Sequence, residues 1–234
     1  MELERTFDQL SEILQDISFG SVWRWKNSNP GRKAVGYFPV YAPAEIIHAA
    51  GMLPVGLAGA GDRLDIQHAD SRFGSFICSI IKTTMEMGMT GKLEPFDGFL
   101  FSSICDSARN LSFVFMRNFP QMYVDFLHLP HNSASEPSVD FLESEYRRVI
   151  VELEKLGGQP ITDDALQNSI DLYNLQRSMV QRLYEFRVES PHLLRAWESY
   201  LLVRAGNFLP VREHVEIMGG ALSLLPNRPA KRRD

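Results

Sequence analysis

Four short apolar segments alternate with helical segments in the first half of the chain, and this alternation constrains the fold more than any other feature. The spacing of apolar residues predicts strands at residues 33–41, 52–57, 98–101 and 122–130 and helices at residues 44–50, 73–89 and 106–118. Short connections between such elements are typical of a parallel sheet with helices on its faces. The sequence therefore predicts an α/β fold with a flavodoxin- or Rossmann-like parallel sheet and helices on both faces.

Helical patterns flank this α/β region on both sides. Residues 1 to about 28 are expected to form one amphipathic helix and its exit, and the chain after Pro130 is expected to be helical at residues 139–156, 163–187, 191–205 and 210–222. The predicted organisation is an N-terminal helix and linker (1–32), an α/β cluster-binding domain (33–135), a helical layer (136–225) and a linker or tail (226–234).

Charge and hydropathy exclude two classes of partner. The formal net charge is −5 and no long basic stripe offsets it, which argues against nucleic-acid binding. No apolar run approaches the roughly 20 residues that span a bilayer. The acidic start of the chain is unlike a secretory signal, so we expect a cytoplasmic protein with no membrane partner.

The glycine-rich segment after the second predicted strand does not form a nucleotide motif. Gly56, Gly59 and Gly61 do not make a G-x-G-x-x-G turn between a strand and a helix, and Asp62 follows them. The sequence also has no P-loop and no G-x-S-x-G elbow. We therefore expect a flexible loop here and no nucleotide bound by this chain.

One cysteine lies where a predicted strand passes into a helix, within residues 98–110. Asp106 or Ser107 is expected to cap that helix, which places Cys105 at the carboxyl edge of a parallel sheet. The positive end of the helix dipole favours a thiolate at such a position. The alternative interpretation is a small buried residue that fills a gap in the core.

The second cysteine, Cys78, is expected on the helix at residues 73–89. The residues of that helix expected to face the core are Phe76, Ile77, Ile80, Ile81 and Met85. Two cysteines in a chain without a signal peptide indicate free thiols or metal ligands. They cannot complete a metal site alone, but they could be two thiolate ligands of an iron–sulfur cluster whose other ligands come from elsewhere.

Polar residues near the expected sheet edge are further candidates. Glu45 and His48 share one face of the short helix at 44–50 and could exchange a proton with a ligand, or could simply satisfy each other. Ser102 and Ser103 could bind a sulfur or a thioester, or serve the strand end. The remaining histidines lack the spacing of a zinc motif.

Residues 36–54 resemble the N-terminal signature of the benzoyl-CoA reductase and 2-hydroxyacyl-CoA dehydratase family. Cys78 and the segment at 102–106 fall where that family places its first two cysteines. Within the family, residues 47–49 and 56–62 are more similar to the reductases, and above all to the smaller cluster-bearing subunit type of the ATP-dependent enzymes.

The resemblance implies a subunit with two α/β domains, three cysteines around a [4Fe–4S] cluster, and a coenzyme A thioester as substrate. Cys78 and Cys105 carry over as two metal ligands and cofactor-binding residues. Family subunits continue into a second α/β domain that supplies the third cysteine, whereas this sequence has only two. We therefore expect the third ligand outside this chain, either because the chain is an N-terminal piece or because a separate polypeptide follows.

The resemblance further implies an oxidoreductase that reduces an aromatic acyl-CoA to a cyclohexadiene carboxyl-CoA in anaerobic aromatic degradation. The implied partners are a homologous larger cluster-bearing subunit, ATP-hydrolysing activator subunits and ferredoxin as electron donor. Glu45 and His48 are then candidate catalytic residues in the pocket wall. Two alternatives stay open, a subunit of a 2-hydroxyacyl-CoA dehydratase and a non-catalytic half-subunit that acts as an interaction module.

Overall fold

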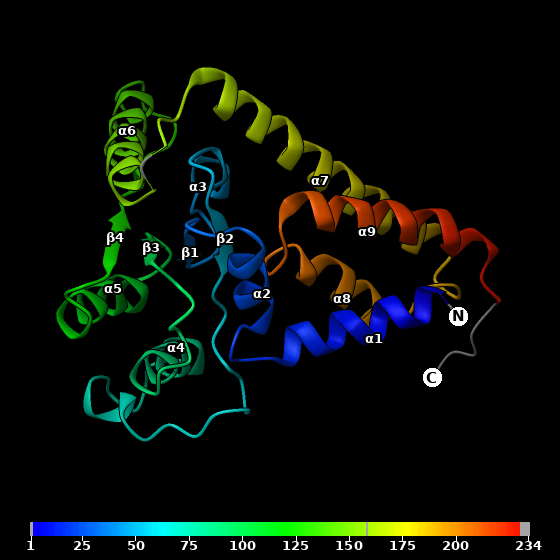
Figure 1. Ribbon diagram of the computed structural model, residues 1–234, viewed down its shortest axis with the longest axis horizontal. Helices are drawn as coiled ribbons and strands as arrows, with labels where there is room; N and C mark the ends of the chain where they lie inside the picture. Colours follow the sequence, from blue (N-terminus) through cyan, green and yellow to red (C-terminus); the bar gives the residue numbers. More distant parts are fainter. Residues whose placement is uncertain (1, 158, 230–234) are drawn as a thin grey trace. The chain divides into compact units, whose positions relative to one another are not determined.

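The computed structural model describes residues 2–157 and 159–229 (Figure 1). Its strands are β1 (Ala34–Tyr37), β2 (Leu53–Gly56), β3 (Gly98–Ser102) and β4 (Tyr123–Leu127). Its α-helices are α1 (Glu2–Gln15), α2 (Gly20–Ser28), α3 (Ala44–Ala49), α4 (Ser79–Met89), α5 (Asp106–Asn118), α6 (Pro137–Gly157), α7 (Asp163–Glu189), α8 (Ala196–Ala205) and α9 (Val211–Leu224). Two short 3₁₀ helices are η1 (Ala69–Ser71) and η2 (Leu225–Asn227).

The chain divides into two compact units. The sheet unit is Ile17–Leu166, and the helical unit combines the segment up to Asp16 with the segment from Gln167 onward. The helix α6 therefore belongs with the sheet, and α1 belongs with the C-terminal helices. The boundaries of these units differ from those of the predicted ranges 1–32, 33–135, 136–225 and 226–234. The predicted domain boundaries stay a prediction.

The sheet has the order β2-β1-β3-β4, and all of its strand pairs are parallel. Every residue of β1, β2 and β3 is buried, as expected where helices cover both faces of a parallel sheet. The predicted α/β fold is confirmed, because each expected strand and each expected connecting helix is present, although β1 ends earlier and α4 begins later than predicted.

Aromatic rings form the centre of the sheet unit. The Phe115 ring of α5 packs at 5.3 Å between centroids against both Phe99 and Phe101 of β3. Gly36 of β1 lies directly against this cluster, since a Cβ atom there would come within 2.6 Å of the Phe99 ring. Close packing of this kind fixes β1 and β3 as neighbours at the middle of the sheet.

The helix α6 is attached to the edge strand β4 by an arginine. The Arg148 guanidinium of α6 donates to the carboxylates of Asp125 and Glu145 and to the carbonyl oxygen of Phe126. Glu145 in turn accepts a hydrogen bond from the backbone N–H of His128, just after β4. Charge-assisted bonds at the strand end therefore tie α6 to the sheet.

The N-terminal region is two helices rather than the single one predicted. The helix α1 ends at Gln15, and Phe19 adopts a left-handed conformation with φ of 53° before α2 begins. The Phe19 side chain is buried, with its ring 4.9 Å from that of Phe96 between centroids. Burial of this ring favours the break, which apolar periodicity alone does not reveal.

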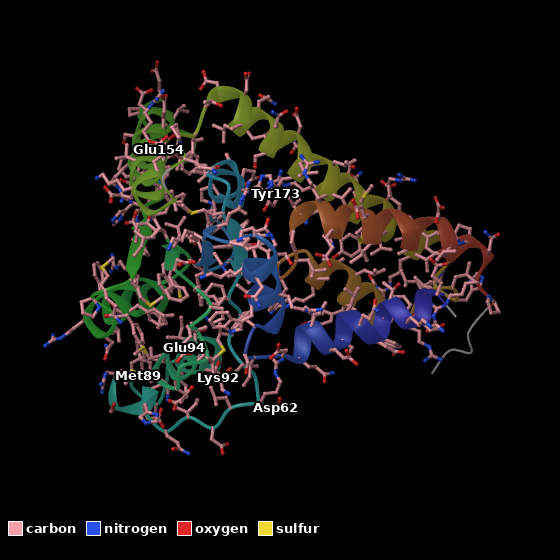
Figure 2. The ribbon with its side chains drawn as sticks, in the orientation of Figure 1. Asp62, Met89, Lys92, Glu94, Glu154 and Tyr173 are labelled. Carbon is pink, nitrogen blue, oxygen red and sulfur yellow. The ribbon has the colours of Figure 1, made fainter. Side chains whose placement is uncertain are left out.

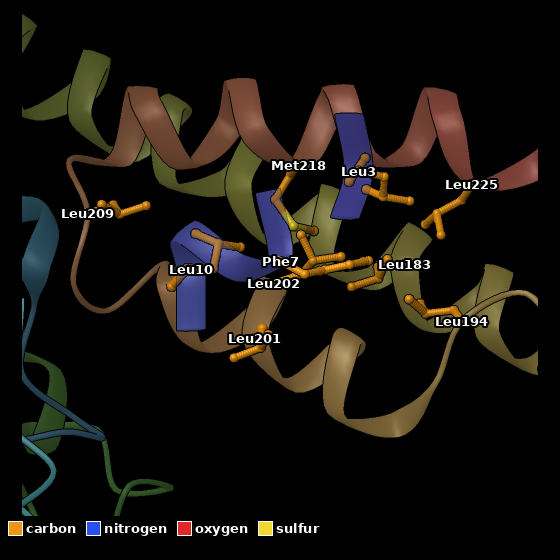
Figure 3. Packing of buried hydrophobic residues seen from close by; sticks show 12 residues of the cluster. Leu3, Phe7, Leu10, Leu183, Leu194, Leu201, Leu202, Leu209, Met218 and Leu225 are labelled. Atoms are coloured by element: carbon orange, nitrogen blue, oxygen red, sulfur yellow. The ribbon is translucent and has the colours of Figure 1, made fainter. Parts of the chain in front are cut away.

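The helical unit has a hydrophobic core of its own (Figure 3). In α1, Leu3, Phe7 and Leu10 are all buried. They pack with leucines and Met218 of the C-terminal helices, among them Leu202 in α8. This unit contains α1, α8, α9, η2 and most of α7.

The segment expected to be a linker or tail, residues 226–234, includes a side chain that packs into the helical unit. Arg228 is only 5% exposed in its side chain and pairs with Glu198, which is fully buried, and with Glu4. Its guanidinium also lies over the Phe7 ring. The buried carboxylate of Glu198 requires such a charged partner. Residues 230–234 of the expected tail lie outside the described residues.

No helix among the described residues combines the length and the apolar character that crossing a membrane requires.

Candidate functional site

In this strand order the chain connections diverge between the ends of β1 and β3. From β1 the chain continues to β2 on one side, and from β3 it continues to β4 on the other. Sites in open parallel sheets lie where such connections diverge, outside the carboxyl ends of the strands. Here the Phe38 backbone N–H donates to the Leu100 carbonyl at 2.9 Å, and the Ser102 hydroxyl donates to the Phe38 carbonyl at 3.2 Å. The two strand exits therefore lie side by side.

Cys105 lies at this edge, three residues after β3. It is exposed and unpaired, which contradicts its alternative interpretation as a buried gap filler. Cys105 itself is the N-cap residue of α5, so the expectation that Asp106 or Ser107 caps the helix is wrong. Asp106 instead lies in the first turn, where its carboxylate pairs with Arg109 at 3.1 Å. The short connection after β3 leaves the thiol in front of the first helical turn.

Cys78 is also an N-cap residue, because α4 begins at Ser79 rather than at Phe73 as predicted. The expected core positions Phe76 and Ile80 are 87% and 46% exposed. Ile81 and Met85 are buried as predicted. Apolar residues just before α4 imitate a helical stripe, but the chain turns there, with the Ile77 backbone N–H bonded to the Gly74 carbonyl.

Both thiols lie at the same edge of the sheet. The N-terminal half of α4 lies beside the exit of β2, since the Ala60 backbone N–H donates to the Thr83 hydroxyl at 3.0 Å. The helix α5 follows directly from β3, and α4 packs against α5. Each cysteine therefore lies at the N-terminal end of its helix.

Thiolates are the ligands that iron–sulfur clusters take from proteins, so these two cysteines fit such a group chemically. The sequence holds two cysteines, so any further thiolate ligand has to come from outside this chain. Within residues 2–157 and 159–229, no three His, Cys, Asp or Glu side chains gather as a metal site. The chain on its own thus offers two ligands rather than a complete coordination shell.

The two serines before Cys105 bond to backbone. Ser102 is buried with its hydroxyl bonded to Phe38, and the Ser103 hydroxyl donates to the Leu127 carbonyl at 3.4 Å. These bonds connect the exit of β3 to its neighbours β1 and β4. They indicate a structural role in shaping the edge.

Glu45 and His48 are partly exposed residues of α3, the helix that follows β1. Pro43 is the N-cap residue of α3, and Glu45 lies in the first turn. Burial, and secondarily the nearby charge of Glu45, raises the pKa of Tyr146 in α6. Glu45 therefore lies close to a tyrosine that no sequence pattern singled out.

A cavity of about 730 Å³ opens beside α3 and α6. Its apolar wall comes mainly from α6, with Ile46 of α3 and Ile161, and Tyr146 is one of its polar groups. Cavities of this size and character are typical of small-molecule sites. Glu45 does not line this cavity, but it lies near Tyr146, which does.

A polar face on α4 was not predicted from the sequence. Lys82, Thr83 and Glu86 are all buried, although two of them carry charge. Burial raises the pKa of Glu86, but hydrogen bonds from His68, Ala69 and Gln67 outweigh it and lower the pKa below its usual value. The sequence feature that could have indicated this polar face is the i to i+4 spacing of Lys82 and Glu86 within an apolar helix.

Comparisons with known proteins agree on one family. The family model described as 2-hydroxyglutaryl-CoA dehydratase, D-component, matches residues 39–234. The chain is 40% identical to a benzoyl-CoA reductase subunit of Thauera aromatica over 95% of its length and 58% of that protein. It is 30% identical to the (R)-phenyllactyl-CoA dehydratase beta subunit of Clostridium sporogenes, over 80% of the chain and 49% of that protein. It is also 30% identical to the beta subunit of (R)-2-hydroxyglutaryl-CoA dehydratase of Acidaminococcus fermentans, over 87% of the chain and 54% of that protein. The chain thus spans about half the length of these curated relatives.

Proposed function

The chain belongs to the family of the 2-hydroxyglutaryl-CoA dehydratase D-component, and we propose that it serves as a benzoyl-CoA reductase subunit. In this proposal an ATP-dependent, ferredoxin-driven complex reduces an aromatic acyl-CoA to a cyclohexadiene carboxyl-CoA. One observation carries it: the two cysteines of the chain both precede helices at the carboxyl edge of the sheet. The 40% identity to a reductase subunit favours this substrate class.

Cys78 and Cys105 would hold a [4Fe–4S] cluster, with the remaining ligation supplied from outside this chain. The cluster, when bound, supplies transfer of single electrons at a low potential, for which biological clusters reach about −700 mV. The thiols are ready ligands because each is exposed and lies in front of a helix N-terminus.

The residues that precede the two cysteines would limit water at the sulfurs. Ile77 and Ile104 come directly before Cys78 and Cys105. Apolar neighbours and few hydrogen bonds to the sulfurs keep the potential of an iron–sulfur centre low. The helix N-termini in front of the two thiols would act in the opposite direction, because they favour the more negative reduced state of such a centre.

Glu45 and His48 would hold and move protons. Reduction of an aromatic ring by two electrons also adds two protons, so the site needs a proton donor near the substrate. Glu45 lies on the helix that leaves the exit of β1, close to Tyr146 and its cavity. A carboxyl group at the edge that also carries the thiols is well placed for this role.

The partners in this proposal are a homologous larger cluster-bearing subunit and ATP-hydrolysing activator subunits. The activator would deliver electrons that ferredoxin alone cannot supply at the required potential. The chain itself has no nucleotide motif, so ATP would act on the activator and not here.

A second candidate is a subunit of a 2-hydroxyacyl-CoA dehydratase. It is favoured by the family description and by relatives named as dehydratase subunits at 30% identity. In that reaction the injected electron is recycled and water is eliminated. A third candidate, a non-catalytic half-subunit, is favoured by the supply of two cysteines rather than a full ligand set.

Electron stoichiometry separates the first two candidates. We expect the anaerobically purified complex to consume two electrons for each aromatic thioester converted, and to leave 2-hydroxyacyl-CoA unchanged. Catalytic conversion of the 2-hydroxyacyl thioester with substoichiometric reductant would establish the dehydratase instead. A complex that holds no iron in this subunit would support the interaction module.

A further inference from the structure

The polar face of α4 is directed at the long loop that connects β2 to α4. This loop, residues 57–78, ends at Cys78 and is called here the cysteine loop. Figure 2 labels Asp62 on its exposed part and Met89 at the far end of α4. Cys105 follows its strand after a short connection, whereas Cys78 comes after this long loop and depends on the course that the loop takes.

Glu86 makes the central contact between α4 and the cysteine loop. Its carboxylate accepts hydrogen bonds from the backbone N–H groups of His68 and Ala69, both at 2.8 Å. The other carboxylate oxygen lies 2.7 Å from Nδ1 of the His68 ring. The Glu86 side chain is 1% exposed, so these loop groups replace the water that a carboxylate normally binds.

Two neighbours of Glu86 hold the loop at other points. The nearly buried Lys82 ammonium pairs with the Asp70 carboxylate at 2.7 Å. The Thr83 hydroxyl accepts a hydrogen bond from the Ala60 backbone N–H at 3.0 Å and donates to the Ser79 carbonyl at 2.7 Å. The cysteine loop is therefore bound to α4 near both its beginning and its middle.

An apolar side chain at position 86 would cost less to bury than a carboxylate. A buried carboxylate is of use where several backbone donors of a loop need one fixed acceptor. Here those donors belong to the loop that leads to Cys78, and the acceptor belongs to the helix that begins after it. The bond pattern thus closes the loop onto the helix that carries the cysteine at its N-cap.

We propose that Glu86 is a positioning residue for Cys78, because its carboxylate holds His68 and Ala69 against α4 and so fixes the loop that places the thiol. The significance of this for ligation rests on the proposed function, in which Cys78 is a cluster ligand. The geometry of the loop itself does not require the cluster.

A nitroxide label on Cys78 in the Cys105→Ala chain tests the proposal. Glu86→Ala should narrow the electron spin resonance spectrum and shorten the rotational correlation time at least twofold, because the loop is released. Glu86→Gln should restore the original line shape, since its amide oxygen can accept both backbone bonds. Glu143→Gln is the matched control, because Glu143 pairs with exposed Arg147 on α6 and should leave the label unchanged.

A label on Cys105 in the Cys78→Ala chain distinguishes positioning from general loosening of the fold. Glu86→Ala should leave the Cys105 line shape unchanged. A folded Glu86→Ala chain with an unchanged Cys78 label, or with equal changes at both labels, would overturn the proposal. If Glu86→Ala does not fold, Glu86→Leu fills much of the same space without a hydrogen-bond acceptor, and it too should release the Cys78 label; an unchanged label in that folded chain contradicts the proposal.

The label experiment needs no iron, which separates it from the proposed function. If the Cys78 label responds to Glu86→Ala as expected but the complex binds no iron, Glu86 remains a positioning residue and Cys78 is rejected as a cluster ligand. If the complex retains its cluster but the Cys78 label does not respond to Glu86→Ala, Cys78 can remain a cluster ligand and Glu86 is rejected as its positioning residue.

Discussion

Cys78 and Cys105 occupy equivalent positions, each directly before the first residue of a helix, and the two helices α4 and α5 pack against each other. Both thiols are exposed and unpaired. Neither thiol caps its helix by a side-chain hydrogen bond. Each of the two helices thus carries an exposed thiol at its N-terminal end.

The ionised form of Glu86 is expected to stabilise the fold in a pH-dependent way. Its pKa is lowered from the usual 4.5, so its contribution is complete above about pH 4.5 and is lost as the pH falls through the lower folded-state value. At pH 7, Glu86→Gln should reduce the free energy of unfolding by about 1–3 kcal/mol. Urea titrations from pH 7 to pH 3 measure this. A difference between the two proteins that stays constant with pH would contradict the account.

Removal of Glu198 should destabilise the helical unit strongly. Glu198→Ala takes the fully buried carboxylate away from the nearly buried Arg228 guanidinium, and loss of one member of a buried pair costs about 3–5 kcal/mol. The matched control Glu143→Ala breaks the exposed pair with Arg147 and should cost less than about 1 kcal/mol. Thermal and urea unfolding compare the two. Equal effects would show that the buried network does not stabilise the unit.

Alanine substitutions at Gly59 and Gly61 distinguish the cost of a left-handed backbone conformation from the cost of a close contact with α4. Both have positive φ, 70° and 62°, but a Cβ atom at Gly59 would lie 2.5 Å from the Thr83 hydroxyl, whereas Gly61 has open space. Alanine at Gly61 should cost about 1–2 kcal/mol for the left-handed conformation alone. Gly59→Ala should cost more, because it also displaces the loop from α4. Unfolding measurements that rank the two variants in the opposite order would refute this packing.

Glu45 and His48 are expected to affect turnover without affecting the iron content. In the complex with the full-length subunit, Glu45→Gln or His48→Ala should lower kcat by about 10²–10⁴-fold if the side chain delivers a proton. Activity assays paired with iron analysis measure both quantities. Loss of iron in these variants would point to a structural role, and unchanged kcat would remove them from the mechanism.

The sheet could be predicted from the sequence because its strands are short, apolar and separated by helices of the right length. The exit of β3 was placed correctly for the same reason, and with it Cys105 at the sheet edge. Strands and helices that are set by a local apolar pattern and joined by short connections can therefore be predicted from the sequence.

The start of α4 could not be read in the same way. Phe76 and Ile80 continue the apolar period of Ile81 and Met85, yet they are exposed, because the chain turns just before Ser79, with the Ile77 backbone N–H bonded to the Gly74 carbonyl. In the sequence, Arg228 appears as part of a basic C-terminal segment. In the structure its guanidinium pairs with the buried carboxylate of Glu198. At Arg228 a long-range charged contact overrides the local sequence pattern.

The iron content of cysteine variants tests the central claim most directly. It is measured on the anaerobically purified complex with the full-length subunit, alongside the resonance of the reduced cluster. Cys78→Ala and Cys105→Ala should each abolish the iron and the resonance that belong to this subunit, whereas the neighbouring Ser107→Ala should retain both. Iron and an unaltered resonance in either cysteine variant would contradict the assignment of these thiols as cluster ligands.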